Sequence, residues 1–499
     1  MDGARDGSDR PDGRARGAPP DVAPRDAAPR DAAPRALDLI VSGGRVATPA
    51  GLEAKSIGIA AGRIVALAPT LELPAAEHLR ADGLVVLPGL VDPHVHLGLP
   101  TAGTRTSDDP ASGTAAALHG GVTTVIDFTL QRGAETLADT LAARRAEFEG
   151  VAHCDHAFHV NVTRFGDDFA ERIDAELEAL AALGSCSLKV FTCYSEIGYA
   201  IARADLRTLL GAARRHRQQL LVHAEADALV RRATEALVAA GRTGPAHYPA
   251  SRPAAAEAQA VRDVVEVAAD AGASLYLVHV STAGALAAVR TARRAARAPV
   301  HLETCPHYLV LDDDRYAGPE AAQALVAPPL RSPEDRRALV EAYRNGTIDV
   351  VATDHCCFAR AQKARAGARF TELPKGLAGI ETRLALLHTL VGPVDDAGWR
   401  RLVDCLASNA AKIFGLAPQK GAIRPGADAD LVLFDPDHTW TIEAARLATR
   451  SDVSAYEGMR VRGRVCRVLL RGRTVLADGE RCSVPGGRFV TRSAPESGF

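Results

Sequence analysis

Eight short apolar runs alternate with Ala-rich, amphipathic stretches through the centre of the chain, and this repeat restricts the fold more than any other feature. Apolar strands that alternate with helices are typical of a parallel sheet covered by helices. Eight such units over about 300 residues favour a closed (β/α)8 barrel of the TIM type over an open doubly wound sheet. The predicted strands lie at 84–96, 121–128, 154–163, 186–191, 219–225, 274–281, 299–306 and 349–355.

The segments on both sides of this repeat have a different hydrophobic pattern. Residues 37–86 contain short apolar pieces such as LDLIVSGG and KSIGIAAGRIVALAP, separated by Gly and Pro, which is typical of small β-hairpins. The same pattern of short apolar pieces recurs in GADADLVLFDPD and VRGRVCRVLLRGRTVLADG, near the C-terminal end of the sequence. We therefore expect one small β-sandwich built from both ends of the chain. The predicted parts are a tail (1–36), a first sandwich part (37–86), the barrel (87–417), and a second sandwich part with a C-terminal extension (418–492).

Residues 1–36 contain DVAPRDAAPRDAAPR, a near-repeat with almost no large apolar side chains. Such a segment cannot bury enough apolar surface to offset the entropy of ordering it. The sequence therefore predicts a disordered tail here.

Composition excludes several classes of protein. Lys and Arg number 59 against 61 Asp and Glu, so no overall field attracts nucleic acid or an anionic membrane. The longest apolar runs, such as LVVLPGLV, are far shorter than the roughly 18 residues that span a bilayer. The first residues have no apolar core of the signal-peptide type. Nine cysteines without a C-x-x-C pair argue against a disulfide framework or a zinc ribbon and favour a reducing, cytoplasmic compartment.

Polar residues occur where the predicted barrel strands end, which is the functional edge of such barrels. The first strand ends in His94 and His96, and alternate residues of a strand point to the same side, so both imidazoles face the barrel mouth. His223, His279 and Asp354 end three other strands. Four imidazoles and a carboxylate form a ligand set suited to zinc, or to manganese or cobalt.

Lys189 lies on the fourth apolar strand and admits two interpretations. Next to divalent cations its ammonium would be repelled and desolvated, which lowers the pKa towards the neutral amine. A neutral amine that reacts with CO2 becomes a carbamate with two oxygens, enough to bridge two ions. Alternatively, the side chain extends out of the barrel or pairs with a carboxylate. The residues alone leave both interpretations open.

Nine motifs in this order resemble the cyclic amidohydrolases, and within them the dihydropyrimidinase/D-hydantoinase group. The motifs are VDPHVHLG, SLKVFTCY, LLVHAE, LYLVHVS, ETCPHYL, APPLR, TDHCCF, GIETRL and AAKIFGL. The resemblance runs from about Leu37 to Arg492. It implies a metal-dependent barrel with an accessory β-sandwich, a homotetramer, and a small cyclic ureide or imide as substrate.

The resemblance also implies roles for individual residues. It implies two zinc-type ions bridged by a carboxylated lysine, here Lys189. Tyr194 would contact the substrate carbonyl and stabilise its oxyanion, and Asp354 would carry a proton to the departing ring nitrogen. The residues that match the family's ligands are His94, His96, Lys189 and Asp354 for one ion, and Lys189, His223 and His279 for the other.

The chain departs from the family pattern at two substrate-binding positions. Ala327 replaces the usual serine before two prolines, and Lys375 replaces the usual asparagine in PKGLAGIE. Both positions are expected to bind the substrate ring mainly through backbone groups. The departures therefore bear on substrate preference more than on activity.

The motifs also bear on three other functions. An allantoinase-like amidohydrolase remains open, although SDDPASGT and GIETRL resemble hydantoinases more closely. Dihydroorotases typically carry an arginine just after H-x-H, whereas Leu97 and Gly98 follow here. A non-catalytic scaffold related to dihydropyrimidinases would have lost metal ligands, and this chain has the complete set. The sequence therefore predicts an enzyme that opens the ring of a hydantoin or a 5,6-dihydropyrimidine.

Overall fold

The computed structural model describes residues 36–494 apart from 132, 134, 167, 296–298, 366 and 392–394. The predicted disordered tail lies outside the described residues, except for Ala36.

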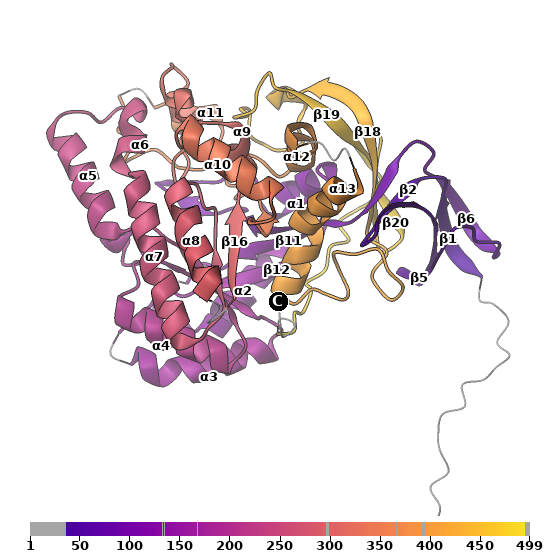
Figure 1. The fold of residues 1–499 in the computed structure, drawn as a ribbon, viewed down its shortest axis with the longest axis horizontal. Helices are drawn as coiled ribbons and strands as arrows, with labels where there is room; N and C mark the ends of the chain where they lie inside the picture. The colour runs from indigo at the N-terminus through magenta and orange to yellow at the C-terminus, as the bar shows by residue number, and fades with distance from the viewer. Residues whose placement is uncertain are drawn as a thin grey trace, which may run out of the picture.

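The centre of the chain forms the predicted parallel barrel (Figure 1). Eight strands pair in sequence order, and each falls within one of the eight apolar runs. A parallel bridge between Val95 and His355 joins the first strand to the segment after the last, and the His96 N–H donates to the His355 carbonyl at 2.8 Å. The strands are β8 (Leu90–Val95), β11 (Val122–Phe128), β12 (Asp155–Asn161), β13 (Ser187–Phe191), β14 (Gln219–His223), β15 (Leu275–Leu277), β16 (Val300–Thr304) and β17 (Val350–Val351).

Helices lie on the outside of these strands (Figure 1). Their starts follow local sequence signals: the Asp109 carboxylate accepts from the Ser112 N–H at the start of α1, and the Thr136 hydroxyl accepts from the Asp139 N–H at the start of α2. The helices are α1 (Pro110–His119), α2 (Leu137–Phe148), α3 (Phe169–Ala182), α4 (Arg203–Arg215), α5 (Asp227–Ala239), α6 (Tyr248–Ser251), α7 (Ala254–Ala271), α8 (Ala283–Ala295), α9 (Pro306–Val310), α10 (Pro333–Arg344), α11 (Arg360–Lys363), α12 (Arg383–Val391), α13 (Asp396–Val403) and α14 (Asn409–Ile413). None of the described helices is both long and apolar enough to cross a bilayer.

Both ends of the chain build the predicted β-sandwich, which lies beside the barrel (Figure 1). An apolar core that includes Ile57, Val86 and Leu431 packs in it. The first sheet has the order β5 (Arg63–Ala68), β4 (Ser56–Ala60), β1 (Leu37–Ser42), β6 (Ala75–Arg80). The second has the order β21 (Glu480–Arg481), β20 (Arg473–Ala477), β19 (Arg460–Leu470), β18 (Leu431–Thr441), β7 (Val85–Pro88), β2 (Arg45–Thr48), β3 (Gly51–Ala54). A short hairpin of β9 (Pro100–Thr101) and β10 (Thr104–Arg105) follows the first barrel strand.

The apolar run at 84–96 divides between the two units. Val85–Pro88 pairs with β18 and β2 in the sandwich, whereas Leu90–Val95 is the first barrel strand. Gly89 lies between them, where a Cβ atom would come within 2.1 Å of the Thr123 hydroxyl oxygen. Only glycine therefore fits where the chain passes from one sheet to the other.

A buried charge cluster ties the sandwich to the barrel. The Lys420 ammonium lies 2.6 Å from Asp155 Oδ2, 2.6 Å from Asp430 Oδ2 and 2.9 Å from Asp428 Oδ2. Asp155 begins barrel strand β12, whereas the other two aspartates precede sandwich strand β18. The Arg471 guanidinium, between β19 and β20, also pairs with Asp155. Because all three carboxylates are buried, the lysine compensates charges that would otherwise repel one another.

Replacing this lysine by methionine keeps the length of the side chain and removes its charge. We expect Lys420→Met to lower Tm by several degrees, because it leaves the three buried carboxylates with only the guanidiniums of Arg471 and Arg63 as cations. Thermal unfolding followed by circular dichroism measures the effect. Lys55→Met, at a partly exposed ion pair, is the matched control and should change Tm little. Equal Tm values for the two variants would contradict the conclusion that Lys420 holds the sandwich against the barrel.

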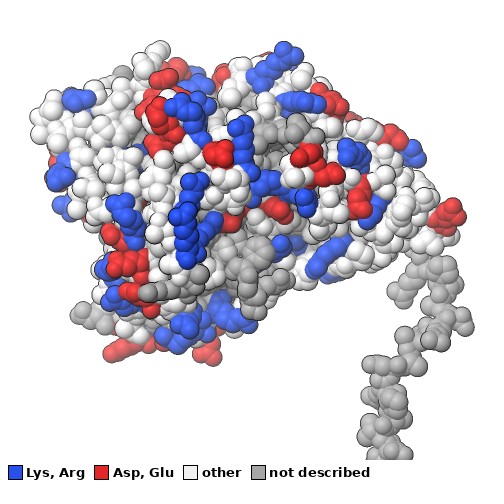
Figure 2. Space-filling model, in the orientation of Figure 1, with Lys and Arg blue, Asp and Glu red and all other residues white. Residues whose placement is uncertain are grey.

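Charged side chains are mixed on the face shown in Figure 2, where Lys and Arg are interspersed with Asp and Glu. This face therefore presents no extended field of one sign.

Candidate metal centre

All nine residues predicted for the site line one cavity of about 740 Å³. The cavity lies at the carboxyl ends of the barrel strands, which is the edge where the sequence placed the site. The residues are His94, His96, Lys189, Tyr194, His223, His279, Ala327, Asp354 and Lys375.

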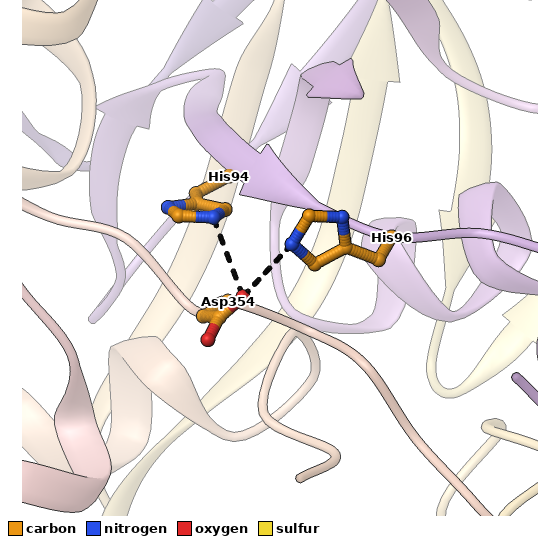
Figure 3. A group of neighbouring side chains, drawn as sticks. All are labelled: His94, His96 and Asp354. Atoms are coloured by element: carbon orange, nitrogen blue, oxygen red, sulfur yellow. Dashed lines mark ion pairs between the residues drawn. The ribbon is translucent and has the colours of Figure 1, made fainter. Parts of the chain in front are cut away.

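The first and last barrel strands bring three ligand-type side chains together (Figure 3). His94 Nε2 lies 3.3 Å and His96 Nε2 3.0 Å from Asp354 Oδ1. Burial opposes ionisation of Asp354, but the two imidazoles outweigh it and hold the pKa of the carboxyl well below its usual range. Burial also lowers the pKa of His96. The anionic carboxylate of Asp354 and the neutral ring of His96 therefore face one another at neutral pH.

Glu303, from strand β16, orients His94. Its Oε1 lies 2.7 Å from His94 Nδ1, and because a carboxylate only accepts, Nδ1 carries the proton. The lone pair of His94 then lies on Nε2, the atom that faces Asp354. Glu303 also accepts from the Tyr276 hydroxyl and from the His279 N–H. One buried carboxylate thus fixes the position of two predicted ligands.

His223 and His279 form a second group of donors. His223 Nδ1 lies 2.9 Å from His279 Nε2, and His223 Nε2 donates to Glu225 Oε2 at 2.7 Å. Burial lowers the pKa of His223 to about 4 and that of His279 well below its usual range, so both rings are neutral. Ligands around a tetrahedral ion with Zn–N distances of about 2.0 Å lie about 3.3 Å apart. The spacing of the two nitrogens therefore suits a shared ion.

Lys189 lies between the two groups. Its Nζ is 5.4 Å from the Phe128 ring centroid and 5.3 Å from that of Phe191. The Phe128 ring packs against His94 at 4.8 Å, and the Phe191 ring against His223 at 5.8 Å. No hydrogen bond or ion pair joins this Nζ to another described residue. Burial lowers the pKa of Lys189 to about 8, so part of the population has the neutral amine that reacts with CO2.

These donors fit a pair of divalent ions. Imidazole nitrogens and a carboxylate are ligands that zinc prefers, and they converge on one cavity from four strands or strand ends. A buried amine with no polar partner among the described residues lies where a shared bridging ligand would be needed. Cys193 is close to His223 and Glu225, but burial raises the pKa of its thiol, so it is a poor ligand in this state.

Tyr194 follows strand β13 and is held by Arg252. The Arg252 Nη2 donates to the Tyr194 hydroxyl at 3.1 Å, and its guanidinium pairs with the buried carboxylate of Glu225. Because the phenol oxygen accepts from Arg252, the phenol proton is available for another acceptor. Burial raises the pKa of Tyr194 well above its usual range, so this proton stays in place at neutral pH.

Three site residues have backbones in the left-handed region, which non-glycine residues rarely adopt. They are Tyr194 (φ +71°), His279 (φ +38°) and Asp354 (φ +48°). Such strain persists only where the surrounding contacts enforce it, and it gathers at functional sites. The strained backbone therefore lies in the same part of the cavity as the predicted metal ligands.

Sequence reasoning missed Glu225, Glu303 and Arg252. Glu225 follows His223 at the spacing that separates His94 from His96, so strand alternation could have placed it on the same side. Glu303 is likewise a carboxylate within an apolar run. Arg252 lies just after the short helix α6, and no local pattern connects it to Tyr194. His159, on strand β12, has a structural role, because its ring bonds to Ser187 Oγ and to the Pro93 carbonyl.

Comparisons of the sequence and of the structure with known proteins all indicate the same family. The Amidohydrolase family model matches residues 85–475. A D-hydantoinase of Streptomyces coelicolor is 37% identical over 465 residues, which cover 91% of this chain and 98% of that protein. A dihydropyrimidinase from Brevibacillus agri has a solved structure that matches with a TM-score of 0.86 at 35% identity, covering 91% and 99% of the two chains. The structure of a D-hydantoinase from Bacillus sp. AR9 matches with a TM-score of 0.88 at 35% identity, covering 92% and 100%.

Proposed function

Because the chain belongs to the amidohydrolase family, within its group of hydantoinases and dihydropyrimidinases, we propose that it hydrolyses the cyclic amide bond of a hydantoin or a 5,6-dihydropyrimidine. The product is an N-carbamoyl amino acid. The observation that carries the proposal is the convergence of four histidines, an aspartate and a buried lysine in one cavity. A scaffold that had lost its metal ligands would not retain this set.

The proposed metal centre uses the residues described above. When bound, two divalent ions supply a nucleophilic hydroxide near neutral pH and polarise the ring carbonyl. Lys189 would bridge them after its neutral amine attacks CO2, which forms an N–C bond and releases a proton. Zinc suits the donors, and manganese or cobalt are alternatives. The residues that would hold one ion are His94, His96, Lys189 and Asp354, and those for the other are Lys189, His223 and His279.

Tyr194 stabilises the negative charge that develops on the carbonyl oxygen. Its hydroxyl accepts from Arg252 and therefore donates its own proton to the substrate oxygen. Arg252 is a positioning residue: its pairing with Glu225 fixes the guanidinium, and the guanidinium fixes the phenol.

Asp354 transfers a proton from the nucleophile to the leaving ring nitrogen. Its pKa lies well below the usual range despite burial, so the group is an ionised carboxylate at neutral pH. It takes the proton of the attacking hydroxide and passes it to the ring nitrogen as the C–N bond breaks. The ring opens without leaving a charged amide nitrogen.

The proposal includes a cellular setting and an assembly. All nine cysteines lie within the described residues and none forms a disulfide, which supports a reducing, cytoplasmic compartment. The family resemblance supports a homotetramer. The substrate is a small cyclic ureide or imide, and the proposal includes no nucleic-acid or membrane partner.

A kinetic survey tests the function. The purified protein, loaded with zinc, is given hydantoin, dihydrouracil and allantoin, and the ring-opened products are quantified by chromatography. We expect kcat/KM for hydantoin or dihydrouracil to exceed that for allantoin by at least about tenfold. A chelator should abolish turnover, and added zinc should restore it. A protein that holds two ions per chain and opens none of these rings would refute the proposal, and preferential opening of allantoin would assign the allantoinase function instead.

A further inference from the structure

The cavity contains a cation that no described residue neutralises. Lys375 lines the wall together with Tyr194 and Arg252, and its side chain is half-buried. Its Nζ donates to the Thr371 carbonyl at 3.4 Å, a long hydrogen bond. No carboxylate oxygen of a described residue lies within ion-pair distance of this ammonium. A partly desolvated charge in this position favours an anionic partner.

Lys189 is the proposed bridge between the two metal ions, and the two arginines of the cavity already have partners. Arg252 is paired with Glu225, and the exposed Arg231 lies 3.9 Å from both Asp227 and Glu235. Lys375 therefore differs from the other two in having its charge free for a ligand.

The acidic side chains of the same cavity do not cancel the charge of Lys375. Asp227 accepts from the Ser195 hydroxyl and N–H, and Glu196 is exposed to solvent. Burial and the neighbouring Arg252 lower the pKa of Lys375 to about 8, with Glu196 opposing the shift. The side chain is therefore still predominantly cationic at pH 7.

A second polar group on the same wall also lacks a partner. The hydroxyl of Tyr248 is buried and makes no hydrogen bond within the described part of the chain. Lys375 Nζ lies 6.0 Å from the Tyr248 ring centroid. Burial raises the pKa of Tyr248, so its hydroxyl keeps its proton and can donate. A buried hydroxyl without a partner is costly, and a ligand oxygen would satisfy it.

We propose that Lys375 and Tyr248 bind a carboxylate of the substrate, so that the preferred substrate is a cyclic ureide with an acidic substituent on its ring. The two oxygens of a carboxylate accept from the ammonium and from the phenol together. The inference rests on the proposed function and adds the chemical class of the substituent. Lys375 thus determines specificity through its side chain, beyond the backbone contact expected from the sequence.

The test compares hydantoin-5-acetic acid with its primary amide, which has nearly the same shape and no charge. The variants are Lys375→Gln, Lys375→Arg and Tyr248→Phe in the zinc-loaded enzyme. For the wild-type enzyme, we expect kcat/KM for the acid to exceed that for the amide by at least about tenfold, mainly through KM. Lys375→Gln should bring this ratio close to one, Lys375→Arg should retain most of it, and Tyr248→Phe should lower it in part.

Arg231→Gln is the matched control, because Arg231 lines the same cavity but already has acidic partners. This variant should leave the ratio unchanged. A wild-type ratio near one would overturn the inference, as would Lys375→Gln slowing acid and amide by the same factor. If plain hydantoin is opened in either case, the proposed function stands and only the inference fails. If hydantoin, acid and amide all remain intact, both fail.

Discussion

Lys189→Ala is expected to lose most of its bound metal and at least about 10³-fold in turnover. Lys189 lies between the two ligand groups, with Phe128 and Phe191 packed beside it. An alanine there offers no atom that could bridge two ions. A short carboxylate such as acetate, added to the variant, fits the space and supplies two oxygens, so it should partly restore both metal and rate.

Elemental analysis of metal per chain and steady-state kinetics, each with and without acetate, measure this effect. Lys363→Met is the matched control: Lys363 is also a buried lysine, and burial lowers its pKa to about 7, but it bonds to the Leu325 and Gly376 carbonyls. The control should lose stability and retain its metal. If Lys189→Ala keeps the metal content and rate of the wild-type enzyme, the bridging role is wrong.

Tyr194→Phe is expected to lower kcat by about 10²–10³ while KM changes little. The substitution keeps the aromatic ring and removes only the hydroxyl that Arg252 positions. The lost hydrogen bond is strongest when the carbonyl oxygen carries negative charge, so the transition state loses more than the bound substrate does. The metal content should remain as in the wild-type enzyme.

Tyr199→Phe serves as its control, because Tyr199 lines the same cavity and packs on Phe191 at 5.7 Å. We expect its kcat to stay within about threefold of the wild-type value. Steady-state kinetics of both variants on the best cyclic ureide measure the two kcat values. A kcat for Tyr194→Phe within that same range, with both ions retained, would remove Tyr194 from the mechanism.

The sequence predicted the barrel because its signal is local. Each strand is a short apolar run, and each predicted ligand lies at or near the end of such a run, as His94, His223 and Asp354 illustrate. Strand alternation then requires His94 and His96 to face the same side. Fold topology brings strand ends together, so position along the strand was enough to place these residues in one cavity.

The contacts between side chains could not be predicted in the same way. Arg252 reaches Tyr194 from another part of the chain, and Glu303 reaches His94 from a strand two positions away in the barrel. Such pairings depend on strand register and side-chain rotamer, which no periodicity in the sequence specifies. Tyr248 illustrates the same limit, because only the fold reveals that its hydroxyl is buried without a partner. The division of the run at 84–96 depends on the close approach of Thr123 to Gly89.

The joint between β8 and the segment after β17 has a consequence for how the enzyme is maintained in the cell. A backbone bridge between Val95 and His355 joins the two ends of the barrel, and His94, His96 and Asp354 flank it. An ion held by these three residues would act as a reversible cross-link between segments far apart in sequence, and would gain affinity from the closed ring that it helps to keep shut. Metal starvation would then remove turnover and this cross-link together, so the inactive chain would also become a better substrate for proteases.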